Sequence, residues 1–450
     1  MKRIAPVLFV VVGCASAGAE SGDAGLRSAG APVSAAQQLE TLPPKGSKVD
    51  TAADDAAKAP MRDVAAIRRN GSVVRVRDGH VVVDERPEPP PALVGLDGRT
   101  LVEAISGGAD ATEVHWMHLF TGEPTGVASI RGARLVPTVT DTSGQYVALV
   151  NEAAEKREGA IAPGRTSSTI VIADREVGER YRTTLPGNFY PEAFGTTVAT
   201  SGEPDTIYLL EYLPADAPTH YRVRVLHTAT GEIGLPVNLR FKAQEVDAEM
   251  AGISRTQVVS GHDGGLVFTL YRGVAGEGDR HGYAFVHTLG LAGGVWCLDI
   301  AAEMELDTQP GALVVAGDRL VVASANGTVG KYDIAAVVDP TRQPIMDVVR
   351  HYLHPEGEPV LAATDDRVWV AWDDLLYELD ATTLEMVSFE PHRVGGTVSA
   401  LAATDDGLLI AFADGTLELR DGVTIDVTPG ADDDDAADIV ALFVDDAGVT

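Results

Sequence analysis

The sequence is poor in cysteine, in basic residues and in long apolar runs. Only two cysteines, Cys14 and Cys297, occur in 450 residues, which excludes a framework of several disulfides. Lysine and arginine number 35 against 66 aspartates and glutamates, for a formal net charge of −31. Because nucleic-acid binding depends on basic patches, this balance argues against a nucleic-acid partner. The apolar run from Ile4 to Val12 is shorter than the roughly 20 residues of a spanning helix, so no transmembrane helix is predicted.

The N-terminus does contain a short export signal. Lys2 and Arg3 precede the apolar run, a pattern typical of a secretory signal peptide. The run ends in Val11-Val12-Gly13-Cys14, which resembles the lipobox of bacterial lipoproteins. In that family the cysteine receives a diacylglyceryl thioether and becomes the mature N-terminus, so the resemblance implies lipidation of Cys14. The alternative is an ordinary signal peptide cleaved near residues 15–17.

A tether is predicted between this signal and the folded part of the chain. Residues 15–60 contain no Phe, Trp or Tyr and are rich in Ala, Ser, Gly, Pro and Asp, so they bury too little apolar surface to fold. The predicted domains are a signal peptide at 1–13, a lipidated cysteine with disordered tether at 14–60, and a folded domain at 61–450. The predicted location is extracytoplasmic, with the lipid as the one attachment to the cell membrane or envelope.

The second cysteine, Cys297, lies in the strand-like run Gly294–Ile300. If Cys14 carries a lipid, the sequence offers Cys297 no disulfide partner. We therefore expect Cys297 to act as a small buried apolar side chain.

Internal repeats begin at about residue 63, where short apolar strands alternate with Asp-Gly and Asn-Gly turns, a pattern typical of all-β proteins. The hexapeptide Leu361-Ala-Ala-Thr-Asp-Asp366 recurs as Leu401-Ala-Ala-Thr-Asp-Asp406, 40 residues later. Strongly apolar strands starting at Leu320, Val368 and Leu408 are spaced by 48 and 40 residues. A unit of this length fits one four-stranded blade, so the sequence predicts an all-β propeller.

The two ends of the folded region match complementary parts of one repeat. Residues 439–450 align with 398–409, so the chain stops where a second strand should begin, and residues 66–72 resume the pattern by aligning with 410–416. We therefore predict a composite blade, with its first strand from the C-terminus and the rest from residues 63–84, which protects the sheet edges at the closure.

Seven further blades complete the count. They are predicted near residues 92–130, 133–184, 192–240, 252–302, 312–348, 358–391 and 396–428. Eight blades are favoured, and seven remain an alternative because four prolines interrupt the stretch after residue 84.

The repeats resemble YVTN and WD40-like propeller repeats of bacterial exported proteins. The residues that are similar to a group of bacterial propeller lipoproteins are Leu185–Phe194, Tyr208–Pro214, Tyr221–Leu226 and Trp296–Asp299. The sequence departs from the patterns because it lacks a Tyr-Val-Thr-Asn tetrad, and its one Trp-Asp pair, Trp372-Asp373, ends a strand. The resemblance implies a propeller and brings no activity or cofactor with it.

Two segments are candidates for a binding face. Asn188–Phe194 carries three aromatics, Phe189, Tyr190 and Phe194, in what reads as a turn-rich connection, and aromatics are enriched in interface cores. The insertion Asn151–Arg165 is longer than an ordinary hairpin loop. For both segments the alternative is a structural role, as packing over blade ends or as a solvated loop.

The leading functional hypothesis is a monomeric binding or scaffolding propeller whose ligand is a protein, a glycan or a small molecule. The sequence has no Gly-x-Ser-x-Gly elbow, phosphate loop or zinc-ligand spacing, so it predicts no catalytic, cofactor-binding or metal-ligating residue. The alternative is an extracytoplasmic enzyme, lactonase- or quinoprotein-like, with its site at the mouth of the propeller channel. Any cofactor is unknown.

Overall fold

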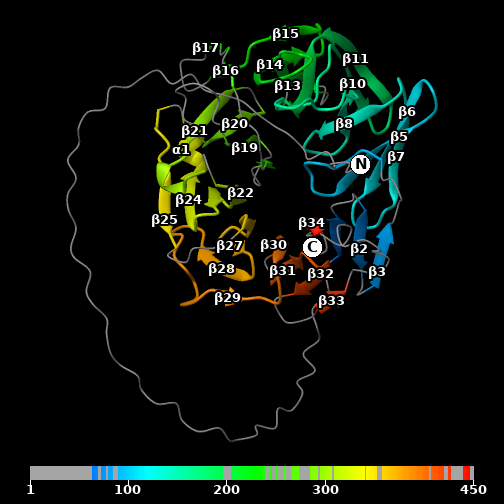
Figure 1. Cartoon of the computed structure of the whole chain (residues 1–450). Helices are drawn as coiled ribbons and strands as arrows, with labels where there is room; N and C mark the ends of the chain where they lie inside the picture. The colour runs from blue at the N-terminus through cyan, green and yellow to red at the C-terminus, as the bar shows by residue number, and fades with distance from the viewer. Residues whose placement is uncertain are drawn as a thin grey trace, which may run out of the picture. The chain divides into compact units, whose positions relative to one another are not determined.

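The structure is a computed structural model, and the strands it contains are those of a propeller (Figure 1). It describes residues 63–68, 72–77, 80–84, 90–195, 204–238, 244–245, 247, 249–250, 257–259, 265–272, 284–291, 294–306, 309–339, 341–351, 357–404, 407–419, 424–426 and 439–445. These residues form eight four-stranded antiparallel sheets and one two-stranded sheet. The predicted signal peptide, Cys14 and the tether lie outside the described residues.

Each four-stranded sheet is one blade, and its strands are called a to d from the first to the last in the sheet order. Blade 1 is β34 (Ile439–Val444), β1 (Val64–Arg68), β2 (Val73–Arg77) and β3 (His80–Asp84). Blade 2 is β4 (Ala92–Val94), β5 (Thr100–Ser106), β6 (Ala111–His118) and β7 (Pro124–Arg131). Blade 3 is β8 (Leu135–Thr140), β9 (Tyr146–Asn151), β10 (Ser167–Asp174) and β11 (Gly178–Pro186). Blade 4 is β12 (Asn188–Phe194), β13 (Thr206–Leu213), β14 (His220–His227) and β15 (Glu232–Gly234).

The second half of the protein repeats the same plan. Blade 5 is β18 (Gln257–Val259), β19 (Leu266–Arg272), β20 (Ala284–Gly290) and β21 (Val295–Asp299). Blade 6 is β22 (Gly311–Ala316), β23 (Arg319–Ser324), β24 (Thr328–Asp333) and β25 (Asp347–Arg350). Blade 7 is β26 (Val360–Ala363), β27 (Arg367–Trp372), β28 (Leu375–Asp380) and β29 (His392–Arg393). Blade 8 is β30 (Val398–Thr404), β31 (Gly407–Phe412), β32 (Thr416–Leu419) and β33 (Thr424–Asp426).

The eight-bladed ring and its composite blade confirm the sequence prediction. Strand β34 from the C-terminus pairs antiparallel with β1, with Val64 opposite Val444. Strands β2 and β3 follow outward in the same sheet (Figure 1). The ring closes because β34 also contacts strand a of blade 8.

Packing between blades explains why strand b of blade 7 is apolar on both faces. In β27, Val368, Val370 and Trp372 face a buried cluster shared with blade 6. The alternate residues Trp369 and Ala371 face a cluster shared with blade 8. Because the sheet is buried on both faces, both sets of alternating positions must be apolar.

Trp372 links two blades through its indole as well as through its packing. Its Nε1 donates a hydrogen bond of 3.1 Å to the carbonyl of Ser324 at the end of β23. Its ring stands edge-on to Tyr377, with the centroids 5.1 Å apart. An acceptor stabilises a buried indole N–H, and that of Trp372 has one on the neighbouring blade.

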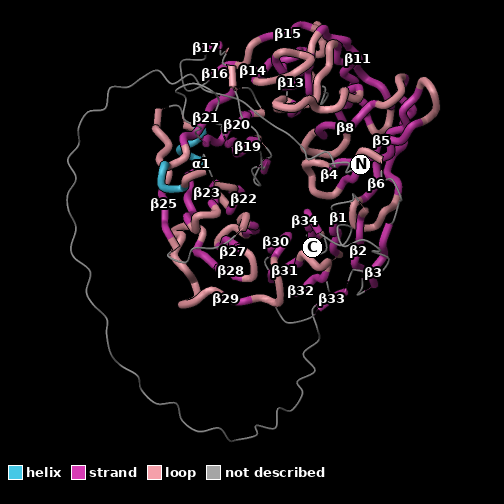
Figure 2. The backbone as a smooth tube through the Cα atoms, viewed as in Figure 1, coloured by secondary structure: helices cyan, strands magenta, loops and turns pink. Residues whose placement is uncertain are grey.

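Helical structure is sparse in the described residues. One α-helix, α1 (Ile334–Val338), follows strand c of blade 6 and appears in cyan in Figure 2. The side chain of Asp333 caps it by accepting from the amide of Ala335 at 2.9 Å, as expected at a helix N-terminus. One 3-10 turn spans Ala302–Met304. None of the helices in the described part of the protein is long and apolar enough for a membrane span.

Cys297 corrects one expectation. It lies on β21, partly buried against the cluster between blades 4 and 5, so its predicted role in packing is confirmed. It is, however, disulfide-bonded, whereas the sequence predicts no disulfide partner for it if Cys14 carries a lipid.

Candidate functional site

The candidate site lies where blades 3 and 4 carry their turns between strands b and c, here called the b–c end. In blade 3 this connection is the insertion, residues 152–166 between β9 and β10. It folds against the corresponding turn of blade 4, residues 214–219. The amide of Ile161 donates to the carbonyl of Pro218 at 2.7 Å, and the amide of Arg165 donates to that of Ala215 at 2.8 Å. The insertion is therefore held against the neighbouring blade by backbone hydrogen bonds.

Gly164 packs directly against the backbone of the blade 4 turn at Asp216. A Cβ built on it would lie 2.3 Å from the carbonyl oxygen of Asp216. The side chain of Asp216 pairs with Arg157 of the insertion at 3.0 Å. Glycine is thus needed at residue 164 because any side chain would push the insertion away from blade 4.

Asn188 joins the two segments that the sequence had singled out. It is fully buried at the start of β12. Its Nδ2 donates to the carbonyl of Pro163 at 2.8 Å, and its Oδ1 accepts from Nη1 of Arg165 at 3.1 Å. Nε of Arg165 also donates to the carbonyl of Asn151 at 2.8 Å. The insertion and the Asn188–Phe194 segment therefore meet at the Arg165 guanidinium.

The second candidate segment is a strand. Asn188–Phe194 forms β12, strand a of blade 4, which corrects the expectation of a turn-rich connection and starts the blade before residue 192. The strand includes Pro191 because β12 is an edge strand, where a proline is tolerated. The pairing with β13 shifts by one residue at a bulge between Pro191 and Ala193.

Burial separates Tyr190 from the two phenylalanines. Phe189 and Phe194 are buried in the cluster between blades 3 and 4. Tyr190 is half-buried, and its ring centroid lies 6.0 Å from Cζ of Arg165, at the outer limit of a cation–π contact. Whether the three aromatics contribute to a binding face stays a prediction.

Arg165 carries its charge without an acid partner. Among the described residues no carboxylate lies within ion-pair distance of it. Burial lowers the pKa of Arg165, while the nearby hydroxyls of Tyr190 and Tyr212 act to raise it. A guanidinium has five N–H donors, and the two hydrogen bonds to Asn151 and Asn188 use two of them. Arg165 is half-buried, and its Nη2 makes no hydrogen bond within the described part of the protein.

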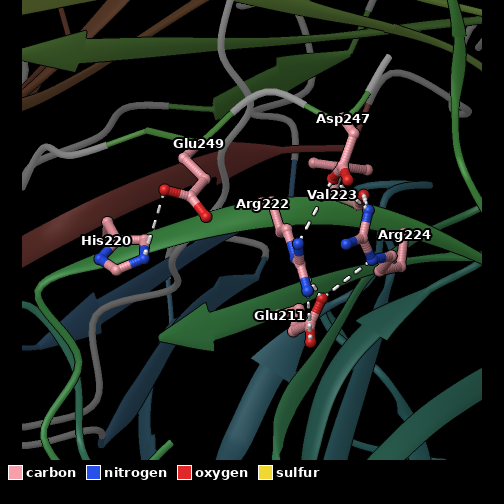
Figure 3. Close-up of polar contacts among 7 residues, drawn as sticks. All are labelled: Glu211, His220, Arg222, Val223, Arg224, Asp247 and Glu249. Atoms are coloured by element: carbon pink, nitrogen blue, oxygen red, sulfur yellow. Dashed lines mark hydrogen bonds and ion pairs between the residues drawn. The ribbon is translucent and has the colours of Figure 1, made fainter. Parts of the chain in front are cut away.

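The outer part of the same end of blade 4 carries a network of ion pairs (Figure 3). Arg222 and Arg224 on β14 both point toward Glu211 on β13, with Nε to Oε2 distances of 2.6 and 2.9 Å. Nη1 of Arg224 also donates to Asp247 at 2.8 Å. The hydrogen bond from Arg222 to Glu211 raises the pKa of Arg222, and the nearby acids add to this.

This network also holds the segment around residue 250 against blade 4. Met250 and Tyr221 exchange two backbone hydrogen bonds of 2.8 and 2.9 Å, so Met250 takes the position of strand d beyond the short β15. His220 lies 3.7 Å from Glu249 (Figure 3). The alternation of Tyr221-Arg-Val-Arg-Val225 in the sequence was the signal that could have located these arginines, since every second side chain shares one face of a strand.

The described part of the protein contains no cluster of three or more His, Cys, Asp or Glu side chains arranged to hold a metal ion. The polar groups that do converge are arginines, carboxylates, amides and tyrosine hydroxyls, which suit recognition by hydrogen bonding and charge.

Comparison with known proteins gives structural likeness alone. No protein-family model matches the sequence, and no curated protein matches it. The computationally designed Ika8 protein is 13% identical with a TM-score of 0.45, covering 80% of this protein and 93% of its own length. BamB from Moraxella catarrhalis is 15% identical with a TM-score of 0.39, covering 80% and 91%. Sqt1 from Saccharomyces cerevisiae is 8% identical with a TM-score of 0.43, covering 72% and 81%. Because the TM-scores are below 0.5, no function is inferred from these similarities. The assignment of eight blades rests on the strand pairing of this protein.

Proposed function

We propose that this protein is a lipid-anchored, extracytoplasmic binding module that holds a partner at the b–c end of blades 3 and 4. The observation that carries the proposal is the insertion, which is ordered against the neighbouring blade and carries the half-buried Arg165 guanidinium, with no acid partner among the described residues. Binding residues are commonly found on loops that a rigid scaffold positions. Here the two flanking blades supply the scaffold, and the insertion supplies the loop.

The exposed side chains of the insertion support a recognition role. Glu155, Lys156 and Glu158 are exposed. After them the backbone is fixed to blade 4 by hydrogen bonds, and before them the amide of Ala154 donates to the carbonyl of Gly164 within the insertion. A loop that is already ordered loses less conformational entropy on binding than a free one. Such a loop is pre-organised to contact a partner.

A photo-cross-linking experiment tests this location. A benzophenone amino acid is introduced at Glu155 of the full-length protein in cells of its native host. The matched control places it at Ser143, an exposed residue in the a–b turn at the opposite end of blade 3. The proposal predicts a discrete adduct from position 155 and none from position 143. Equal adducts from both positions, or none from position 155, would contradict it.

The lipid anchor is supported by the lipobox-like residues 11–14 and by the tether composition. Lipidation of Cys14 would also determine whether Cys297 can form an intramolecular disulfide. With only two cysteines in the sequence, a thioether on Cys14 and an intramolecular disulfide at Cys297 exclude each other. Mass spectrometry of the N-terminal peptide decides between them, and metabolic labelling with an alkyne fatty acid should mark the wild-type protein and leave the Cys14→Ser variant unlabelled.

A further inference from the structure

We propose that Arg165 recognises a carboxylate group of the bound partner. This inference rests on the proposed function and names the chemistry of its ligand. The protein has 66 acidic residues against 35 basic ones, yet no carboxylate among the described residues pairs with Arg165. In the same end of blade 4, Arg222 and Arg224 each contact a carboxylate.

The environment of Arg165 favours an anion that comes from outside the molecule. A charge withdrawn from water without a counter-ion is unfavourable, and burial acts on this guanidinium by lowering its pKa. Its present acceptors, the carbonyl of Asn151 and the amide oxygen of Asn188, are both neutral. An incoming anion would therefore replace water at a partly desolvated cation and gain a charge-assisted hydrogen bond.

The remaining donors fit a planar acceptor. Two of the five guanidinium N–H groups are used, which leaves those on Nη2 and the second one on Nη1. Two adjacent N–H groups match the two oxygens of a carboxylate. The ring of Tyr190 beside them offers an apolar surface to whatever carries that group.

The charge of the site favours a carboxylate over a phosphate. The other arginine of the insertion, Arg157, pairs with Asp216 at 3.0 Å. One guanidinium therefore faces the ligand, which matches a monoanion better than the charge of nearly −2 on a phosphate monoester at neutral pH. The carboxylate of an aspartate or glutamate residue and that of a polypeptide C-terminus share this chemistry, and the probes below separate them.

The test measures peptide binding to the full-length protein by saturation-transfer NMR. The first probe, acetyl-Ala-Ala-Ala, has a free C-terminal carboxylate. The second, acetyl-Ala-Asp-Ala-amide, has the aspartate carboxylate alone. The neutral control is acetyl-Ala-Asn-Ala-amide, and inorganic phosphate at constant ionic strength is the competitor.

The expected result is saturation of one or both carboxylate probes and none of the neutral control. Arg165→Gln should weaken that binding by about tenfold or more, because a hydrogen bond to a charged group is lost. Arg350→Gln, on β25 of blade 6, should leave it unchanged, since it removes an exposed guanidinium outside the candidate site and keeps Arg165. Arg165→Lys is the second variant if Arg165→Gln does not fold, and it should bind more weakly than wild type because it keeps the charge and loses the planar fork.

Several results would overturn the carboxylate assignment. They are equal binding of the neutral probe, undiminished binding by a folded Arg165 variant, absence of binding by both carboxylate probes, and displacement by phosphate at low concentration. The proposed function fails separately. If the adduct from position 155 persists when Arg165 is replaced, the partner binds this face by other contacts, and the carboxylate inference alone is wrong.

Discussion

Val64 lies directly opposite Val444 in the antiparallel pair of β1 and β34, so the first and last described strands belong to one sheet. The junction continues one residue beyond each strand, where the amide of Asp445 donates to the carbonyl of Asp63 at 3.0 Å. The side chain of Asp445 then pairs with Arg99 of blade 2 at 3.1 Å. Closure of the ring thus depends on backbone pairing between residues from the two ends of the domain.

Deleting residues 439–450 should destabilise the whole propeller. The deletion removes strand a of blade 1, including the buried Ile439 and Leu442, and burial of each such side chain contributes about 1.5–3 kcal/mol. We expect a lower and broader thermal transition, measured by circular dichroism. The matched control is Arg99→Gln, which breaks a solvent-exposed ion pair and should change stability by less than about 1 kcal/mol. An unchanged transition after the deletion would contradict the role of β34 in closure.

Trp372→Ala should be among the most destabilising single substitutions in the described core. The indole is 1% exposed, and its loss leaves a cavity between blades 6 and 7 and an unmatched Ser324 carbonyl. Truncation of a buried tryptophan costs about 3–5 kcal/mol. Urea unfolding measures the change, and Phe389→Ala is the control, since Phe389 is 98% exposed. Similar losses in both variants would refute the inter-blade role of Trp372.

Gly164→Ala should detach the insertion from blade 4. The new methyl group would lie 2.3 Å from the carbonyl of Asp216, and overpacking of this kind costs about 1–3 kcal/mol. Hydrogen exchange at the amides of Ile161 and Arg165, which bond to blade 4, should become faster. The control Gly407→Ala meets no neighbour within 4 Å and should leave that exchange unchanged. Protected amides in the Gly164 variant would show that the insertion is held in another way.

Stability should fall as the pH drops below about 6.5, the pKa of histidine in an unfolded protein. His287 is fully buried, and desolvation lowers its pKa well below that of the unfolded state. The unfolded state therefore takes up the proton first, and the loss of stability grows from about pH 6.5 down to the folded pKa. Burial lowers the pKa of His351 as well, which adds to the same trend.

Urea midpoints between pH 7.5 and pH 5 measure this effect in the wild type and in His287→Leu. The variant should lose less stability over that interval, because one of the two depressed histidines is gone. Asp174 does not confound the comparison. Its lowered pKa affects stability at about pH 4 and below, where the unfolded carboxyl becomes protonated. Parallel pH dependences in the two proteins would contradict the assignment to His287.

The repeats were readable from the sequence because the blades are built from local hairpins of apolar strands, and several of these have Asp-Gly or Asn-Gly turns, as at Gly98, Gly327 and Gly415. The offset between residues 361 and 401 located two neighbouring blades, and the alignment of 439–450 with 398–409 located the closing strand. The start of blade 4 was misread because Pro191 suggests a turn. A proline is compatible with an edge strand, and the sequence does not state which strands are edges.

The sequence predicted the two segments of the candidate site but not their contact. The length of the insertion and the aromatics after Asn188 drew attention to both segments. Their meeting at Arg165 depends on how blade 3 lies beside blade 4, a long-range relationship that no local pattern encodes. The sharing of Glu211 by Arg222 and Arg224 depends in the same way on the register of β13 and β14, which places Glu211 opposite Arg222.

The most direct test of the account is the yield of the cross-linked adduct from position 155 of the full-length protein, measured with Arg165 present and with Arg165→Gln. We predict a discrete adduct with the wild-type guanidinium and a much weaker one in the variant, with Arg350→Gln on blade 6 retaining the full yield. No adduct from position 155, or the same adduct from position 143 at the opposite end of blade 3, would contradict binding at the b–c end of blades 3 and 4.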